Sequence, residues 1–206
     1  MNLSDWFFLF IKQIIATSWL EWIAVIFGVL EVLFAKRNKV WLYPTGIISI
    51  ITSMFLLADA KLYAEVLLSI YYLVMSIYGW VIWKSHSSLG VRMITKSNQK
   101  DFAITLAISL LGWIFLYQIL SNFTDSDVPY LDAFVSSTAW AGMWLLTRRK
   151  LENWIWLNIS NLVAIPLLFH KQLPMFALLT LFLFVIAIFG YIDWKKILKQ
   201  KIILKN

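Results

Sequence analysis

The 206-residue sequence contains no cysteine, which excludes disulfides, thiolate metal sites and thiol nucleophiles. Charged residues are scarce: they form 14% of the chain, against about a quarter in an average soluble domain. The two histidines, His86 and His170, lie in predicted connections, and the H-E-x-x-H and G-x-S-x-G motifs are absent. We therefore expect neither enzymatic activity nor a cofactor.

Hydrophobic residues make up 61% of the chain. They occur in blocks of about twenty, the length that crosses a hydrocarbon core of roughly 30 Å as an α-helix. The sequence therefore predicts an all-α integral membrane protein, with the lipid bilayer as its first partner. We predict seven transmembrane helices, near residues 19–35, 41–58, 62–83, 102–121, 130–147, 153–169 and 174–194.

The N-terminal stretch "MNLSDWFFLFIKQIIATSW" lacks the basic start and small-residue cleavage site of a signal peptide. Its Trp6, Phe7, Phe10 and Ile14 recur at helical spacing. We expect residues 1–18 to form an amphipathic helix at the membrane interface.

Basic residues predict the orientation. Fifteen of the eighteen Lys and Arg fall on one side of the membrane in this topology. They lie in three alternate connections, at the end of the last span and in the tail, residues 197–206. This distribution predicts a cytoplasmic C-terminus and an N-terminus outside. The net charge of +7 is thus a topology signal, and we expect no nucleic-acid partner.

Two segments align without a gap, "LLADAKLYAEVLLSIYYLVMSIYGWVIWK" (56–84) and "LLFHKQLPMFALLTLFLFVIAIFGYIDWK" (167–195), and we call the constant shift between them the repeat offset. They share the ending I-x-G-aromatic-x-x-W-K. We predict two three-helix repeats, 19–84 and 130–196, with the helix at 102–121 as a linker. In this 3+1+3 parallel arrangement, substrate binds between the repeats near mid-membrane.

The candidate binding residues lie in "LENWIWLNISNLVAIPLLF", residues 151–169. On a helical wheel, Asn158 falls about 40° to one side of Trp154 and Asn161 falls about 20° to the other. Amides on one face either hold helices together, for about 0.6–2 kcal/mol, or form a binding wall with the tryptophan. We favour the wall. Second-tier candidates are Ser49, Ser69, Tyr72 and Trp41.

Ionisable residues within the spans are few. Glu21 and Asp132 begin their spans on the outer side, Glu65 begins the third span, and Glu31 lies about a turn from the basic "KRNK". Most of them lie near enough to a predicted interface to be solvated or paired. Coupling to a proton gradient usually needs a carboxylate deep in the membrane, so the sequence favours passive, facilitated transport.

"WLEWIAVIFGVLEVLFAKRNKVWLYPTGI", "LYAEVLLSIYYLVMSIYGWVIWK" and "ENWIWLNISN" together resemble the PnuC-type vitamin transporter family, from about residue 19 to 196. The resemblance implies a fold related to the SWEET sugar transporters. It also implies facilitated uptake of nicotinamide riboside across the bacterial inner membrane, made directional by phosphorylation in the cytoplasm. The family motif W-x-x-W-x-x-x-N falls on Trp154 and Asn161, with Leu157 at the second tryptophan position.

That departure leaves the substrate open, because related members are thought to carry thiamine and, in some cases, riboflavin. Nicotinamide riboside and thiamine both present a flat cationic ring and hydroxyl groups, and a tryptophan face attracts such a ring by about 0.5–2 kcal/mol. We expect nicotinamide riboside, with thiamine as the alternative. A structural membrane protein without a transported ligand and a pore with unsaturable flux are the other hypotheses. The sequence is compatible with a homo-oligomer.

Overall fold

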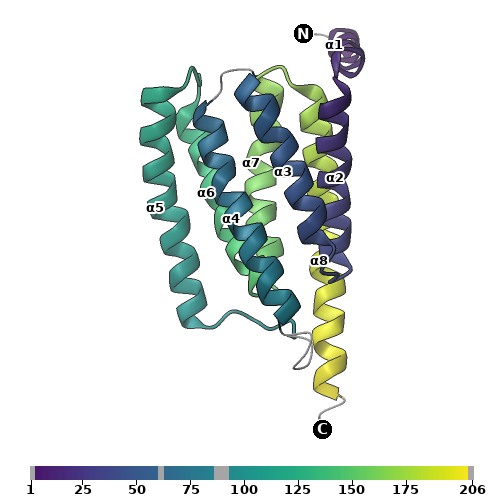
Figure 1. Cartoon of the computed structure of the whole chain (residues 1–206), viewed down its shortest axis with the longest axis vertical. Coiled ribbons are helices and arrows are strands. Elements are labelled where there is room, and N and C mark those ends of the chain that lie inside the picture. The colour runs from purple at the N-terminus through teal and green to yellow at the C-terminus, as the bar shows by residue number, and fades with distance from the viewer. Residues whose placement is uncertain (1–2, 60–62, 86–92, 204–206) are drawn as a thin grey trace.

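The computed structural model describes residues 3–59, 63–85 and 93–203. Lys61, His86, Arg92 and the last three residues of the predicted tail lie outside this part. Within it the chain forms eight helices (Figure 1). They are α1 (Leu3–Ala16), α2 (Trp19–Lys36), α3 (Leu42–Asp59), α4 (Tyr63–Ser85), α5 (Gln99–Phe123), α6 (Pro129–Thr147), α7 (Asn153–His170) and α8 (Pro174–Ile203).

Helices α2 to α8 occupy the seven predicted ranges, and two of them are longer than expected. Helix α5 begins at Gln99 because Asn98 and Asp101 form a capping box, each side chain accepting the other's backbone N–H. Helix α8 continues to Ile203, past the predicted end at residue 194, since lysine, leucine and glutamine all favour helix. Much of the predicted tail is therefore helical.

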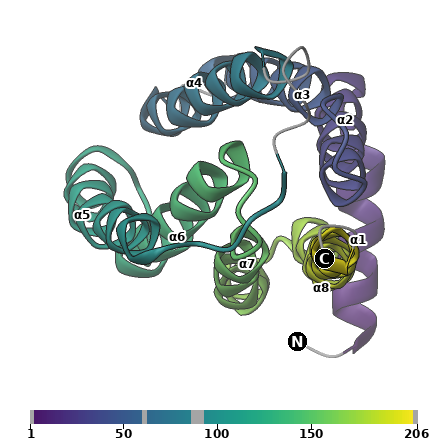
Figure 2. The ribbon, with the colours of Figure 1, turned by 90° about the horizontal axis from the view of Figure 1, so that it is seen from below.

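The helices pack as two groups of three. Helix α3 lies between α2 and α4, and α7 lies between α6 and α8. The groups meet where α2 contacts α8 and where α4 contacts α6, and α5 packs along the outside of α6 (Figures 1 and 2). Any space enclosed by the bundle is therefore lined by both groups.

The surface and length of the helices are those of an integral membrane protein. The outside of α5 exposes Leu111, Ile114 and Phe115, a continuous apolar surface that water would disfavour. Among the described residues, α3, α5 and α8 are long and apolar enough to cross a membrane, and the pair α1 and α2, bent by 105°, adds a fourth span if counted as one. Three charged residues in α2 and three asparagines in α7 lower the apolar character of those helices, so the count of seven spans stays a prediction.

Trp83 and Trp194, which correspond at the repeat offset, make similar contacts, with hydrogen-bond acceptors one residue away from exact correspondence. The indole N–H of Trp83 donates to the carbonyl of Thr147 at 3.0 Å, and that of Trp194 donates to Ala35 at 3.0 Å. Trp83 lies edge-on to Tyr43, with ring centroids 5.2 Å apart and an interplanar angle of 87°. Trp194 lies edge-on to Trp154 at 5.6 Å and 88°. Each tryptophan therefore ties the last helix of one group to the first helix of the other.

Two further recurrences lie within the first two helices of each group. The hydroxyl of Ser49 donates to the carbonyl of Ala24 at 2.7 Å, and Ser160 donates to Val135 at 2.7 Å. The turns that follow α2 and α6 both contain a residue with positive φ, Asn38 at 54° and Arg149 at 53°. The junction between first and second helices thus has the same local geometry in both groups.

Candidate substrate-binding cavities

A cavity of about 250 Å³ lies between the two helix groups, and we call it the central cavity. Helices of both groups line it. The lining residues are Glu31, Val32, Ala35, Ile50, Tyr72, Ala139, Met143, Leu146, Trp154, Leu157, Asn161, Leu183 and Ala187. Of the predicted binding residues, the structure therefore brings Trp154, Asn161 and Tyr72 together around one space.

Trp154 is held tightly by its own neighbours. Its side chain is 1% exposed, and the ring lies against Gly190, where a Cβ atom would come within 2.7 Å of ring carbons. Its indole N–H is buried and has no hydrogen-bond partner among the described residues. The indole is thus fixed in position, with a donor left over. Its predicted role as a stacking surface stays a prediction.

The structure places Asn158 apart from Asn161. Asn158 lines a separate apolar cavity of about 320 Å³ between α7 and α8, together with Ile155, Leu162 and Ile188. Trp154 borders both spaces. The expected single wall is therefore divided: its two amides lie on different sides of the tryptophan, because α8 packs against the α7 face between them.

The remaining second-tier candidates lie outside the central cavity. The hydroxyl of Ser49 donates a hydrogen bond to the carbonyl of Ala24 on α2. Ser69 is half-buried on α4. Trp41 is 62% exposed and lines a different cavity, together with Trp80.

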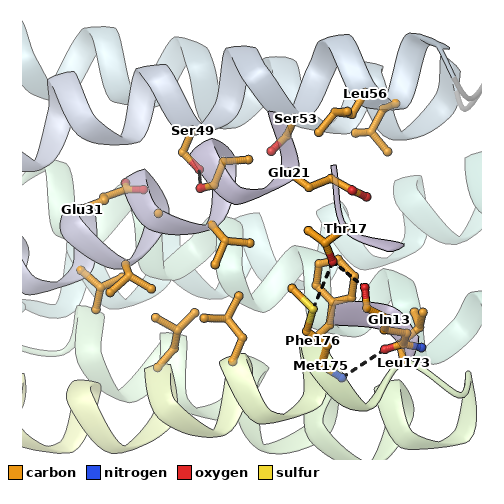
Figure 3. Close-up of a pocket in the computed structure, with 18 of the residues that line it drawn as sticks. Gln13, Thr17, Glu21, Glu31, Ser49, Ser53, Leu56, Leu173, Met175 and Phe176 are labelled. Carbon is orange, nitrogen blue, oxygen red and sulfur yellow. Dashed lines mark hydrogen bonds between the residues drawn. The ribbon is translucent and has the colours of Figure 1, made fainter. Parts of the chain in front are cut away.

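A second, larger cavity of about 620 Å³ lies between α1, α2, α3 and α8, and we call it the lateral cavity (Figure 3). It extends from Gln13 and Glu21 near the α1 end of the bundle to Glu31. Glu31, Val32 and Leu183 line both this cavity and the central one. The two spaces are therefore neighbours that meet at Glu31.

Helix α1 covers the lateral cavity, and two of its side chains contact the bundle: the ring of Trp6 lies edge-on to Phe169 at 5.4 Å, and Gln13 makes hydrogen bonds. The amide of Gln13 donates to the carbonyl of Gln172 at 2.8 Å and accepts the backbone N–H of Met175 at 3.3 Å. The second bond satisfies an otherwise free N–H in the first turn of α8.

Replacing Gln13 with alanine should loosen α1 while leaving the bundle folded. We expect amide hydrogen exchange in α1 to accelerate by about tenfold, as for the loss of one to two hydrogen bonds of about 1 kcal/mol each. Lys12→Ala, an exposed neighbour on the same helix, is the control and should leave exchange unchanged. Equal exchange in the two variants would contradict this anchoring role.

Glu31 is the site residue that the sequence placed wrongly. We expected it near the interface, solvated or paired, but it lines both cavities and faces Gly46 on α3, where a Cβ atom would lie 2.6 Å from its carboxylate. The nearby Lys36 pairs instead with Asp193 on α8 at 3.6 Å. The sequence did contain a signal for this contact. At the repeat offset, Glu31 corresponds to Gly142 and Gly46 corresponds to Leu157. Each helix pair therefore combines one large residue with one glycine, and the large residue is on the first helix in one group and on the second helix in the other.

A small, partly open cavity thus lies between the two helix groups, and its lining includes aromatic rings, one amide and one carboxylate. A family model described as "Nicotinamide mononucleotide transporter" matches residues 18–196. The chain belongs to this transporter family.

Relatives within the nicotinamide mononucleotide transporter family are similar over most of their length. The nicotinamide riboside transporter PnuC of Neisseria mucosa is 27% identical over 197 residues, which cover 89% of this chain and 74% of the relative. PnuC of Escherichia coli is 21% identical over 203 residues, covering 86% and 85%.

The fold also has a counterpart among solved structures. The crystal structure of the vitamin B3 transporter PnuC matches with a TM-score of 0.72 and 24% identity, over 96% of this chain and 90% of that one. The chain therefore has the fold of a PnuC-type, multi-pass membrane protein.

Proposed function

We propose that the protein takes up nicotinamide riboside across the bacterial inner membrane and that it is not an enzyme. The observation that carries this proposal is the family match over residues 18–196. Relatives that share most of the chain are named nicotinamide riboside transporters. The central cavity, with groups suited to a flat, hydroxylated solute, is the binding site in this proposal.

The residues of the central cavity have complementary roles in this proposal. Asn161 offers an amide donor and acceptor to the carboxamide or ribose hydroxyls of the substrate, and the free indole N–H of Trp154 offers a further donor. Tyr72 provides an aromatic face for the nicotinamide ring. The apolar remainder of the lining excludes water, which strengthens each polar contact.

The two helix groups act as parallel repeats in this proposal, in a 3+1+3 arrangement with α5 as the linker. The contacts that recur at or near the repeat offset support it, as do the matched α2–α8 and α4–α6 interfaces. Rocking of one group against the other would expose the central cavity to each side in turn. The basic-residue distribution supports an N-terminus outside, so the lateral cavity lies on the outer side. Net uptake then follows from phosphorylation of the substrate in the cytoplasm.

Thiamine is the second candidate substrate. The feature that favours it is Leu157, which lines the central cavity at the position where the family motif has its second tryptophan. A leucine there changes the shape of the cavity and removes one aromatic face, while the cationic character of both ligands stays compatible with the remaining groups.

Replacing Asn161 with leucine should weaken nicotinamide riboside binding at least about tenfold, because the isosteric side chain leaves the substrate's polar groups unpaired. Titration calorimetry on the detergent-purified protein measures this effect, with nicotinamide riboside and thiamine compared in parallel. Asn158→Leu is the matched control, since Asn158 lies on the same helix but lines a different cavity. We expect it to keep wild-type affinity.

The outcomes separate the hypotheses. Saturable binding of the riboside, lost in Asn161→Leu alone, supports the proposal. Binding of thiamine alone would identify thiamine, and not nicotinamide riboside, as the substrate. A folded protein that binds neither compound would favour a structural role. A larger loss in Asn158→Leu than in Asn161→Leu would move the site to the cavity between α7 and α8.

A further inference from the structure

The carboxylate of Glu31 has an unusual setting for a charged group. It is half-buried within the helix bundle, where it lines the lateral cavity (Figure 3) and also the central cavity, and it packs against the backbone of Gly46. It makes no hydrogen bond or ion pair with any residue that the structure describes. An ionised carboxylate away from bulk water is costly unless a positive charge accompanies it.

No cationic side chain of the described residues lines either cavity. The charged residues of the two linings are Glu31, shared by both, and Glu21 near the α1 end of the lateral cavity. Figure 3 shows two serine side chains between these carboxylates. The nearest basic residue along α2, Lys36, is engaged by Asp193 and by the ring of Phe189. The charged side chains of the described residues along this route are therefore all acidic.

The carboxylate is present in one helix group and absent from the other. The residue that corresponds to Glu31 at the repeat offset is Gly142, which packs against Leu157. In the second helix group, α6 therefore packs on α7 without a charged residue at the position that corresponds to Glu31. The central cavity consequently has one negative group, which matches a ligand with one positive charge.

We propose that Glu31 is the charge-selecting residue of the transporter: its carboxylate pairs with the positive ring of the substrate where the lateral cavity meets the central cavity. The inference rests on the proposed uptake function and adds a residue and a selection rule to it. A cationic ring is favoured over an uncharged ring of the same shape, because only the cation gains a charge pair with Glu31. Asn161 and Trp154 then recognise the shape of the ligand, and Glu31 recognises its charge.

The test compares nicotinamide riboside with its reduced 1,4-dihydro form, which keeps the carboxamide and ribose but has no ring charge. Calorimetric titration of the wild-type protein should show at least about a tenfold preference for the cation, as for a charge pair at partial burial. Glu31→Gln is nearly isosteric and should reduce that preference to about one, chiefly by weakening the cation. Glu31→Asp, which keeps the charge on a shorter side chain, should retain part of it.

Glu21→Gln is the matched control, the same substitution on the same helix. Glutamine preserves the capping box at Ser18, so stability and the equilibrium preference for the cation should remain. An unchanged preference in Glu31→Gln would overturn the inference, as would a folded variant that loses both ligands equally, which would indicate a packing role. If the wild-type protein bound neither ligand, the proposed function itself would fail, a result distinct from either of these.

Discussion

Gly190→Ala and Gly79→Ala are each expected to destabilise the protein by about 1–3 kcal/mol or more, as overpacking of a rigid interior does. A Cβ atom at Gly190 would lie 2.7 Å from ring carbons of Trp154, and one at Gly79 would overlap the ring of Tyr43. Neither ring can retreat, because each is held edge-on by a buried tryptophan one turn further along the glycine's own helix. The Gly190 variant should also weaken substrate binding, since Trp154 lines the central cavity.

The matched control is Gly112→Ala on α5. A Cβ atom there meets Ser137 at 3.4 Å, an ordinary contact, and alanine is favoured over glycine in a helix by up to about 1 kcal/mol. This variant should be as stable as the wild type or more so. Thermal unfolding in detergent measures all three. Equal melting temperatures for Gly190→Ala and Gly112→Ala would show that the Trp154 ring can move aside.

The helices were predictable because their signals are local. Blocks of apolar residues and the intervening turns gave ranges close to α2–α8. The family was also predictable from the sequence, and the family model confirms it. The start of α5 at Gln99 was not predicted, although its signal is also local: Asn98 and Asp101, three residues apart, form a capping box. The helical continuation of α8 was missed because a change to basic composition was taken as the end of the helix.

The site was only partly predictable, because a helical wheel ranks directions on one helix without showing its neighbours. Trp154 and Asn161 do border one cavity, but Asn158, about 40° from Trp154, falls on the far side of the contact between α7 and α8. Glu31 was misplaced for the same reason. Its short distance along the chain from the basic "KRNK" suggested a solvated or paired group near the interface, while the direction of the side chain, toward Gly46, depends on how α3 packs.

Leu157→Trp should reduce binding of nicotinamide riboside by about a hundredfold or more, since an indole occupying the site would exclude most of the ligand's contacts. Leu157 already presses on the backbone of Gly142, so that a Cβ atom there would lie 2.8 Å from its Cγ. A larger side chain finds no room toward α6 and must extend into the central cavity. That cavity measures only about 250 Å³, near the lower limit for a small-molecule site.

The control is Leu162→Trp, the same substitution on the exposed side of α7, which should leave affinity unchanged. Calorimetry on both variants, with thermal unfolding to verify that each is folded, makes the comparison. Wild-type affinity in Leu157→Trp would show that the cavity expands to accept the second tryptophan of the family motif, and the size of the central cavity would then not determine the substrate. A selective loss, with Leu162→Trp intact, would instead make the Leu157–Gly142 contact a determinant of specificity. In that case the exchange of large and small residues between the two helix groups would serve two purposes: Gly46 makes room for the carboxylate of Glu31, and Gly142 makes room for the side chain that limits the site.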